Sequence, residues 1–139
     1  MWKTYAILAA VFASLTAIFA KIGIKGVDSN LATAIRTVVI LLITWGIVFF
    51  GNAARGIRDL TPTNWLFLIL SGVATGLSWI FYFKALQLGD ASKVAPIDKL
   101  SVVFTILLSF LILNEQFSWK VLLGGCLIAC GSIVILMDK

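Results

Sequence analysis

The fold class follows from LATAIRTVVILLITWGIVFF, residues 31–50, a stretch of 20 residues with a single charged residue, Arg36. A helix of about 20 residues rises about 30 Å, which is the thickness of the hydrocarbon core of a bilayer. Its apolar and polar residues do not alternate, as they would in a half-buried strand. The stretch therefore predicts a helix that crosses a membrane.

The composition of the whole chain agrees with this prediction. Of the 139 residues, 61% are hydrophobic and 12% are charged, and the mean hydropathy is +1.09. A soluble domain usually carries about 25% charged residues, and at this length it buries only about two thirds of its surface. The composition excludes an ordinary soluble enzyme, a disordered chain and a disulfide scaffold.

Similar apolar stretches recur on both sides of the first. Together they predict an all-α, polytopic membrane protein with five spans, at approximately residues 5–22, 31–50, 65–85, 94–113 and 119–137. None of the connections is long enough for a folded domain, so residues 1–139 are predicted to form a single transmembrane domain. Lys3 and the apolar run after it also suggest a signal peptide, but the run is long and lacks a good cleavage site, which favours a retained helix.

Turn-forming residues separate the spans. Gly26–Asn30 joins the first two spans with Gly, Asp, Ser and Asn. In the longest connection, Pro62 is predicted to stop one element, and Thr63 or Asn64 to cap the next helix. Ser118 is a candidate cap for the last span.

The distribution of basic residues hardly favours one orientation of the chain in the membrane over the other. The chain has 11 basic and 6 acidic residues, and the basic ones are scattered rather than clustered, so no nucleic acid is expected as a partner. Five spans place Lys3, Arg55, Arg58 and Lys120 on one side, and Lys21, Lys25, Lys84, Lys93 and Lys139 on the other. Four against five hardly orients the chain by the positive-inside rule. Two copies inserted in opposite senses are one interpretation, and an orientation fixed by insertion or by a partner chain is the other.

The sequence lacks the residues that several kinds of catalytic and metal chemistry require. The sequence has no His, and Cys126 and Cys130 lie in an apolar segment without the spacing of a metal site. It has no P-loop, nucleophile elbow or dinucleotide fingerprint. Asp98 is a single acid inside the spans rather than one of a catalytic pair. We therefore expect a protein that is not an enzyme and has no catalytic residue, metal or cofactor.

Polar side chains within the spans indicate a candidate substrate site. A charge in a span costs about 2.5–3.5 kcal/mol on insertion scales, so it normally faces the interior of a bundle. Arg36 lies within the second span. In the fourth span, Asp98, Ser101 and Thr105 recur at helical spacing and share one face.

The third span adds an aromatic wall beside hydroxyl groups. Trp79 and Tyr82 form this wall, and aromatic faces bind organic cations. Simple helix packing is the alternative explanation for the same two residues.

Pro96, near the start of the fourth span, has two interpretations. Within a helix it loosens a carbonyl near residues 91–92, which then binds a ligand or permits gating. In the first turn it is tolerated without a kink.

Small residues predict close helix packing in two spans. Gly72 and Gly76 form a GxxxG motif in the third span. Gly124 and Gly131 belong to a run of small residues in the fifth span, which has no charge inside and suits a subunit contact.

The run YFKALQLGDASKVAPI, residues 82–97, resembles the EamA-type repeat of the drug/metabolite transporter superfamily. The resemblance continues through LNEQFS, residues 113–118, which is similar to the family's L-x-E loop. It ends with LGGCLIACG, residues 123–131, which is similar to its G-x-x-L-I-x-x-G helix. Phe19–Gly23 and Arg36 fit the first half of the repeat, so the resemblance covers nearly the whole chain.

The resemblance implies secondary transport of small metabolites, amino acids or drugs across the cell membrane of a prokaryote. Typical members hold two such repeats, so a single five-helix repeat implies a homodimer in the lipid bilayer, antiparallel in arrangement. Lys21, Pro96 and Glu115 recur from the family pattern, and we expect them to have gating or structural roles.

Two functions follow. The first is a subunit of an alternating-access transporter for a small metabolite, amino acid or organic cation, whose substrate would contact Arg36, Trp79, Tyr82, Asp98, Ser101 and Thr105. Asp98 would be the proton- or ion-coupling acid or the counter-ion of a cation, whereas Arg36 would suit a carboxylate-bearing substrate. The second is an accessory membrane subunit that transports nothing and pairs with another integral membrane protein.

Overall fold

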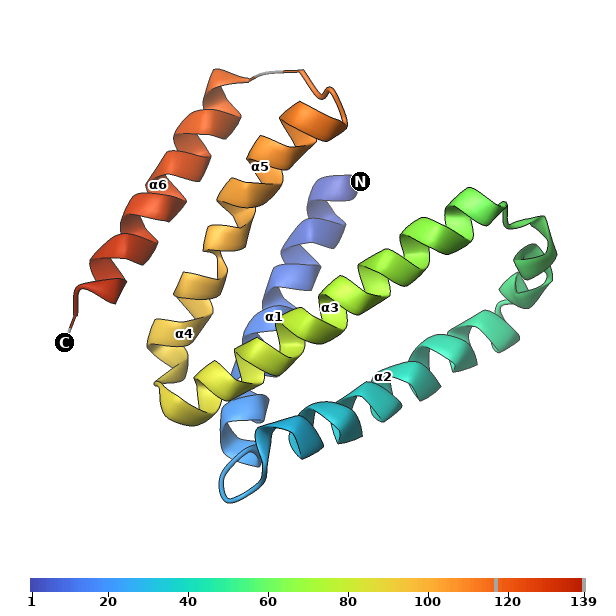
Figure 1. Ribbon diagram of the computed structural model, residues 1–139, viewed down its shortest axis with the longest axis horizontal. Coiled ribbons are helices and arrows are strands. Elements are labelled where there is room, and N and C mark those ends of the chain that lie inside the picture. The colour runs from blue at the N-terminus through green and yellow to red at the C-terminus, as the bar shows by residue number, and fades with distance from the viewer. Residues whose placement is uncertain (117, 139) are drawn as a thin grey trace. The chain divides into compact units, whose positions relative to one another are not determined.

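The computed structural model describes residues 1–116 and 118–138, so Phe117 of the loop motif and Lys139 of the charge count lie outside the described residues. Within these ranges the chain is all-α (Figure 1). Its helices are α1 (Trp2–Gly23), α2 (Ser29–Phe50), the 3-10 helix η1 (Ala53–Asp59), α3 (Pro62–Leu88), α4 (Ala91–Asp98), α5 (Leu100–Ile112) and α6 (Trp119–Leu136).

Five helical segments are long and apolar enough to cross a membrane. They are α1, α2, α3, the segment Ala91–Ile112 that contains α4 and α5, and α6. The predicted all-α class and the number of spans are thereby confirmed. The 3-10 helix η1 was not predicted; it occupies the longest connection, between the end of α2 and the start of α3 (Figure 1).

The start of α2 illustrates how the sequence sets the ends of the spans. Asp28 is the N-cap of α2, and its Oδ1 accepts hydrogen bonds from the backbone N–H groups of Asn30 (2.9 Å) and Leu31 (3.1 Å). These are two of the donors that a helix leaves unpaired in its first turn. Gly26, in the turn before this cap, has a φ of 73°, which glycine adopts without strain.

The start of α3 corrects one prediction. Pro62 does not stop an element but is the first residue of α3, a position where its missing N–H costs nothing. The cap is Thr61 rather than Thr63 or Asn64, because the Thr61 hydroxyl oxygen accepts from the backbone N–H of Asn64 at 3.2 Å. Ser118 does occupy the N-cap of α6, without a side-chain hydrogen bond.

The fourth span is interrupted, and this corrects the interpretation of Pro96 as a first-turn residue. Because α4 begins at Ala91, Pro96 lies inside the helix, where it cannot donate to the carbonyl of Ser92. The helix ends two residues later, and α5 begins after Lys99. Bonds between residues three apart flank the break, from Lys99 N–H to the Pro96 oxygen and from Val102 N–H to the Lys99 oxygen, both 3.0 Å.

The chain divides into two compact units. One consists of Met1–Phe19 with Leu88–Lys139, and the other of Ala20–Gln87. In the first unit, α6 packs against both α4 and α5. In the second, α2 and α3 run in opposite directions (Figure 1).

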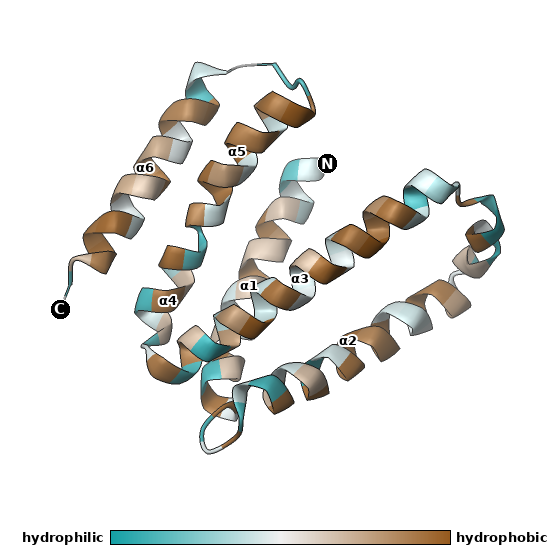
Figure 2. Ribbon diagram, in the orientation of Figure 1, coloured by the Kyte–Doolittle hydropathy of each residue, from teal (hydrophilic) through white to brown (hydrophobic). Residues whose placement is uncertain are grey.

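Most apolar side chains of the spans are exposed on the isolated chain. Among the described residues, the buried hydrophobic ones are Ala17, Ile24, Phe83 and Leu86. Hydrophobic residues occupy most of the length of the long helices, whereas hydrophilic ones gather at helix ends and connections (Figure 2). Such a surface requires an apolar surrounding, because a soluble monomer rarely exposes apolar patches of more than a few hundred Å². The chain is an integral membrane protein with five spans.

Candidate functional site

Arg36 forms the centre of a cation–aromatic cluster in the unit Ala20–Gln87. It is the eighth residue of α2, and its side chain reaches α3. The guanidinium carbon lies 4.3 Å from the centre of the Trp79 ring and 5.1 Å from that of Phe83. Both distances fall within the range of about 6 Å in which a cation is attracted to a ring face.

The rings of α3 hold one another in place. Trp79 and Phe83 are one helical turn apart, so both side chains meet the same neighbouring helix. Phe83 is 3% exposed, which fixes its ring. Tyr82 contacts Phe83 edge to face, with the ring centres 6.3 Å apart and the planes at 66°.

The geometry changes the interpretation of the aromatic wall. The sequence suggested that Trp79 and Tyr82 receive an organic cation, but the cation over the Trp79 ring is the chain's own Arg36. Phe83 belongs to the cluster and was not among the predicted site residues. Its spacing of four residues from Trp79 is the signal that identifies it in retrospect.

The C-terminal end of α3 is tied to the preceding segments of the same unit. The Lys21 ammonium donates to the carbonyl oxygen of Leu86 at 2.7 Å, and the side-chain amide of Gln87 donates to the Val27 oxygen at 3.0 Å. The Leu86 carbonyl is one of those that a helix leaves unpaired in its last turn, where a cation is also favoured by the helix dipole. Lys21 therefore anchors the C-terminal end of α3, beyond the Arg36 cluster. Its expected gating or structural role stays a prediction.

The second charged feature lies in the other unit, at the break in the fourth span. The Lys99 ammonium is 3.3 Å from Oδ2 of Asp98, and the two side chains are 52% and 37% exposed. The pair is adjacent in sequence and sits where α4 ends and α5 begins. Interrupted helices are a recurrent feature of the ion and substrate sites of transporters.

Ser132 of α6 fixes this break and was not predicted. Its hydroxyl donates to the carbonyl oxygen of Pro96 at 2.9 Å, and the residue is 3% exposed. The sequence contains no signal for this contact, because it depends on how α6 packs on α4.

Some hydroxyl groups of the third and fourth spans donate hydrogen bonds within their own helices. Thr105 donates to the Ser101 carbonyl oxygen at 2.9 Å, and Thr75 makes the same bond to Ser71. Such a hydroxyl needs no aqueous cavity, because its donor is already satisfied four residues back. The stripes are therefore weaker indications of a cavity than their spacing suggests, although each oxygen can still accept a bond.

The predicted substrate residues belong to both units. Arg36, Trp79 and Tyr82 lie in one, where Arg36 contacts the Trp79 ring. Asp98, Ser101 and Thr105 lie in the other, where Asp98 pairs with Lys99. Their joint role as one substrate site stays a prediction.

Gly125, rather than the glycines predicted for packing, makes the close helix contact in α6. A Cβ atom at Gly125 would lie 2.8 Å from Cδ1 of Ile106 in α5. A Cβ atom would meet nothing within 4 Å at any of the four predicted positions, Gly72, Gly76, Gly124 and Gly131. The packing role of these four glycines stays a prediction.

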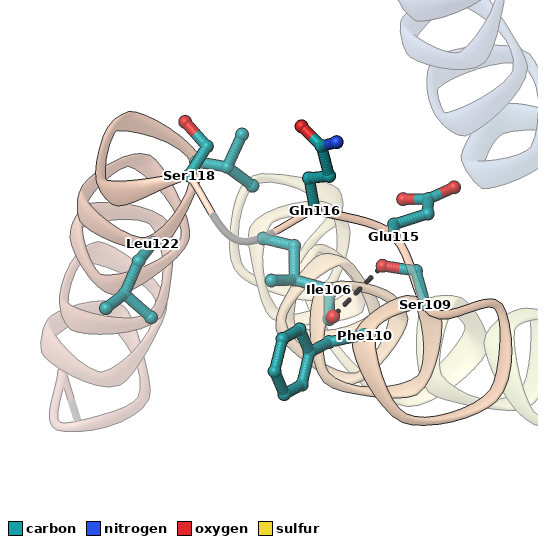
Figure 3. A pocket seen from close by; sticks show the side chains of 8 residues that line it. Ile106, Ser109, Phe110, Glu115, Gln116, Ser118 and Leu122 are labelled. Atoms are coloured by element: carbon teal, nitrogen blue, oxygen red, sulfur yellow. Dashed lines mark hydrogen bonds between the residues drawn. The ribbon is translucent and has the colours of Figure 1, made fainter.

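A small pocket of about 90 Å³ lies where α5 meets α6, lined by Ile106, Ser109, Phe110, Glu115, Gln116, Ser118, Val121 and Leu122. Its polar groups do not converge (Figure 3). The Ser109 hydroxyl donates to the carbonyl of Ile106 in its own helix, and the Glu115 and Gln116 side chains extend away from the pocket. This arrangement does not favour it as the substrate site.

Similarity to known proteins extends over nearly the whole chain. Residues 1–137 match the EamA-like transporter family. A protein of a Sinorhizobium species, described as "Uncharacterized transporter in cobO 3'region", is 46% identical over 134 residues, which cover 96% of this chain and 95% of that protein. The relative is therefore also about the size of one five-helix repeat. No solved structure matches the chain.

Proposed function

We propose that this chain, which belongs to the EamA-like transporter family, is one subunit of a secondary, alternating-access transporter that works as an antiparallel homodimer. Family membership implies a transport role rather than an enzymatic one. The proposed substrate is a small metabolite, amino acid or organic cation, and the proposed location is the cell membrane of a prokaryote.

The observation that carries the proposal is the interrupted fourth span. α4 and α5 meet at Lys99 inside the segment Ala91–Ile112, next to the pair of charges formed by Asp98 and Lys99. Irregular backbone and charge are expensive at membrane depth and are tolerated where they line a cavity or a site. A purely structural membrane subunit would need neither an interrupted helix nor a charge pair within a span.

The homodimer is supported by size and by charge. The chain and its Sinorhizobium relative match over almost their full lengths, at about one repeat each. The basic residues other than Arg36 and Lys99 divide four against five between the two sides, which permits insertion in both senses. Two copies in opposite orientations would reproduce the symmetry of transporters built from inverted repeats.

The proposed substrate contacts are Arg36, Trp79, Tyr82, Asp98, Ser101 and Thr105, with Asp98 as the coupling acid. Asp98 pairs with Lys99, so a coupling cycle would exchange this partner for a proton or a cation. We expect Asp98→Asn to abolish proton-coupled flux in proteoliposomes while the protein stays folded. Asp90→Asn is the matched control, because Asp90 precedes α4 and makes no side-chain cap bond. Normal coupled flux by the Asp98→Asn protein would refute the coupling role.

Reporters fused to the C-terminus test the antiparallel arrangement. Activity from both sides of the membrane, together with a cross-link between α6 helices of opposite orientation, is the expected result. A single fixed orientation would refute the antiparallel homodimer and favour an accessory subunit with a different membrane partner.

A further inference from the structure

The charge of Arg36 has no counter-ion within its own unit. The acidic residues between Ala20 and Gln87 are Asp28 and Asp59, and both lie outside the spans. Asp28 is engaged as the N-cap of α2. Within this unit Arg36 forms no ion pair with either carboxylate. A charged side chain within a span normally pairs with an opposite charge or with backbone carbonyls, or faces a water-filled cavity.

The contacts of Arg36 leave its guanidinium suited to bind an anion. The guanidinium of Arg36 lies over the Trp79 and Phe83 rings and carries five N–H donors in a rigid planar fork. Such a fork matches the two oxygens of a carboxylate. Because Phe83 is buried, the platform under the guanidinium is fixed before a ligand arrives.

The same arrangement disfavours a cation at this place. A cationic ligand would have to displace Arg36 from the Trp79 ring and would be repelled by its charge. An anion gains from both the charge and the fork. The sequence left open a cation over the rings or a carboxylate at Arg36. The geometry therefore favours the carboxylate.

We infer that Arg36, held by Trp79 and Phe83, binds an oxyanion, and that this oxyanion is a carboxylate group of the transported substrate. The inference rests on the proposed function and specifies its substrate class. The same chemistry is offered by the phosphate of a lipid headgroup, so the experiment separates the two sources.

The test uses nuclear magnetic resonance of the arginine side chains. The sequence contains three arginines, Arg36, Arg55 and Arg58. The full chain, with ¹⁵N-labelled arginine, is purified in an uncharged maltoside detergent, which supplies no phosphate. Sodium acetate is added, with acetamide as the neutral analogue of the same shape and sodium chloride at equal ionic strength. Arg36→Lys identifies the Arg36 signal by its absence.

We expect acetate to move the Arg36 Nε–H signal with saturation, and acetamide and chloride to leave it unchanged. Trp79→Leu should weaken the acetate affinity by about threefold to tenfold, since it removes the nearer ring. Trp45→Leu is the matched control, because Trp45 lies on α2 but stacks on Phe49 instead. The absence of a saturable acetate shift, or an equal response to acetamide, overturns the inference.

Two further measurements separate the possible failures. If phosphatidylglycerol added to the micelles saturates Arg36 and blocks acetate, the anion is a lipid phosphate and the substrate assignment is overturned. If a carboxylate substrate is transported in proteoliposomes and Arg36→Lys leaves its KM unchanged, as Arg55→Lys should, the inference fails while the transporter stands. If acetate binds at Arg36 but no solute is transported, the proposed function fails while the anion site stands.

Discussion

The hydroxyl of Ser132 in α6 donates a 2.9 Å hydrogen bond to the carbonyl oxygen of Pro96 in α4. That oxygen also accepts from the backbone N–H of Lys99, three residues later. The proline thus interrupts the fourth span, and the neighbouring helix supplies a second donor beside the interruption. The break is therefore a fixed part of the fold, with its own partner in another helix.

Removal of this donor should destabilise the protein. Ser132→Ala leaves Lys99 as the remaining partner of the Pro96 oxygen, and we expect a loss of about 0.5–1.5 kcal/mol in the free energy of unfolding. Unfolding in mixed detergent micelles measures the loss. Ser14→Ala is the matched control, because Ser14 donates to Val11 of its own helix. An equal change in both variants would contradict the role of Ser132.

Local sequence predicts the spans well and the contacts between them poorly. Hydropathy alone identifies five helices, because each span satisfies its own backbone and needs only lipid around it. The sequence left the effect of Pro96 open because this effect depends on where α4 starts, and the start at Ala91 places the proline beyond the first turn.

The candidate site was likewise predicted by residue type but not by arrangement. Arg36 and Trp79 were each chosen as polar or aromatic residues within spans, whereas their mutual contact depends on the pairing of α2 with α3. The helical spacing of hydroxyl groups is by itself a weak indication of a cavity. Thr105 and Thr75 show that a hydroxyl in a span is often satisfied by its own helix.

The end of α3 offers a second prediction. Lys21→Met removes the donor to the Leu86 carbonyl and the positive charge at this helix end. We expect a loss of about 1–2 kcal/mol in the free energy of unfolding, because a charged hydrogen bond and a favourable dipole interaction are both lost. Lys25→Met is the control, since Lys25 is exposed in the following turn. Equal stability of the two variants would show that Lys21 does not anchor α3.

The end of α6 allows a prediction about pH. Asp138, beyond the last span, lies 2.8 Å from the Lys93 ammonium, and this hydrogen bond lowers the pKa of the Asp138 carboxyl from its ordinary value of 3.8. A lowered pKa in the folded state means that the contribution to stability is present above about pH 4 and is lost as the pH falls through the folded-state pKa. Because both side chains are substantially exposed, the effect on global stability should be small.

Carboxyl ¹³C titration of Asp138 measures this directly. The wild-type signal should titrate at a lower pH than that of the Lys93→Met protein, in which the pKa returns toward the ordinary value. Lys99→Met is the control, because Lys99 pairs with Asp98 rather than with Asp138. A titration of Asp138 that is indifferent to Lys93→Met would contradict the ion pair.

The contact between α5 and α6 can be isolated by comparing two adjacent glycines. Alanine favours a helix over glycine by about 1 kcal/mol at either position, but only at Gly125 does the added methyl group lie 2.8 Å from Cδ1 of Ile106. We therefore expect Gly125→Ala to be less stable than Gly124→Ala by about 1 kcal/mol at most, because Cδ1 is the far end of the Ile106 side chain and can shift. Ile106→Val removes the Cδ1 atom, so in that background the difference between the two glycine variants should disappear. Thermal unfolding in detergent compares six proteins, namely the parent chain and the two glycine variants, each with and without Ile106→Val. A difference between the glycine variants that persists in the Ile106→Val background would show that this contact is not its cause.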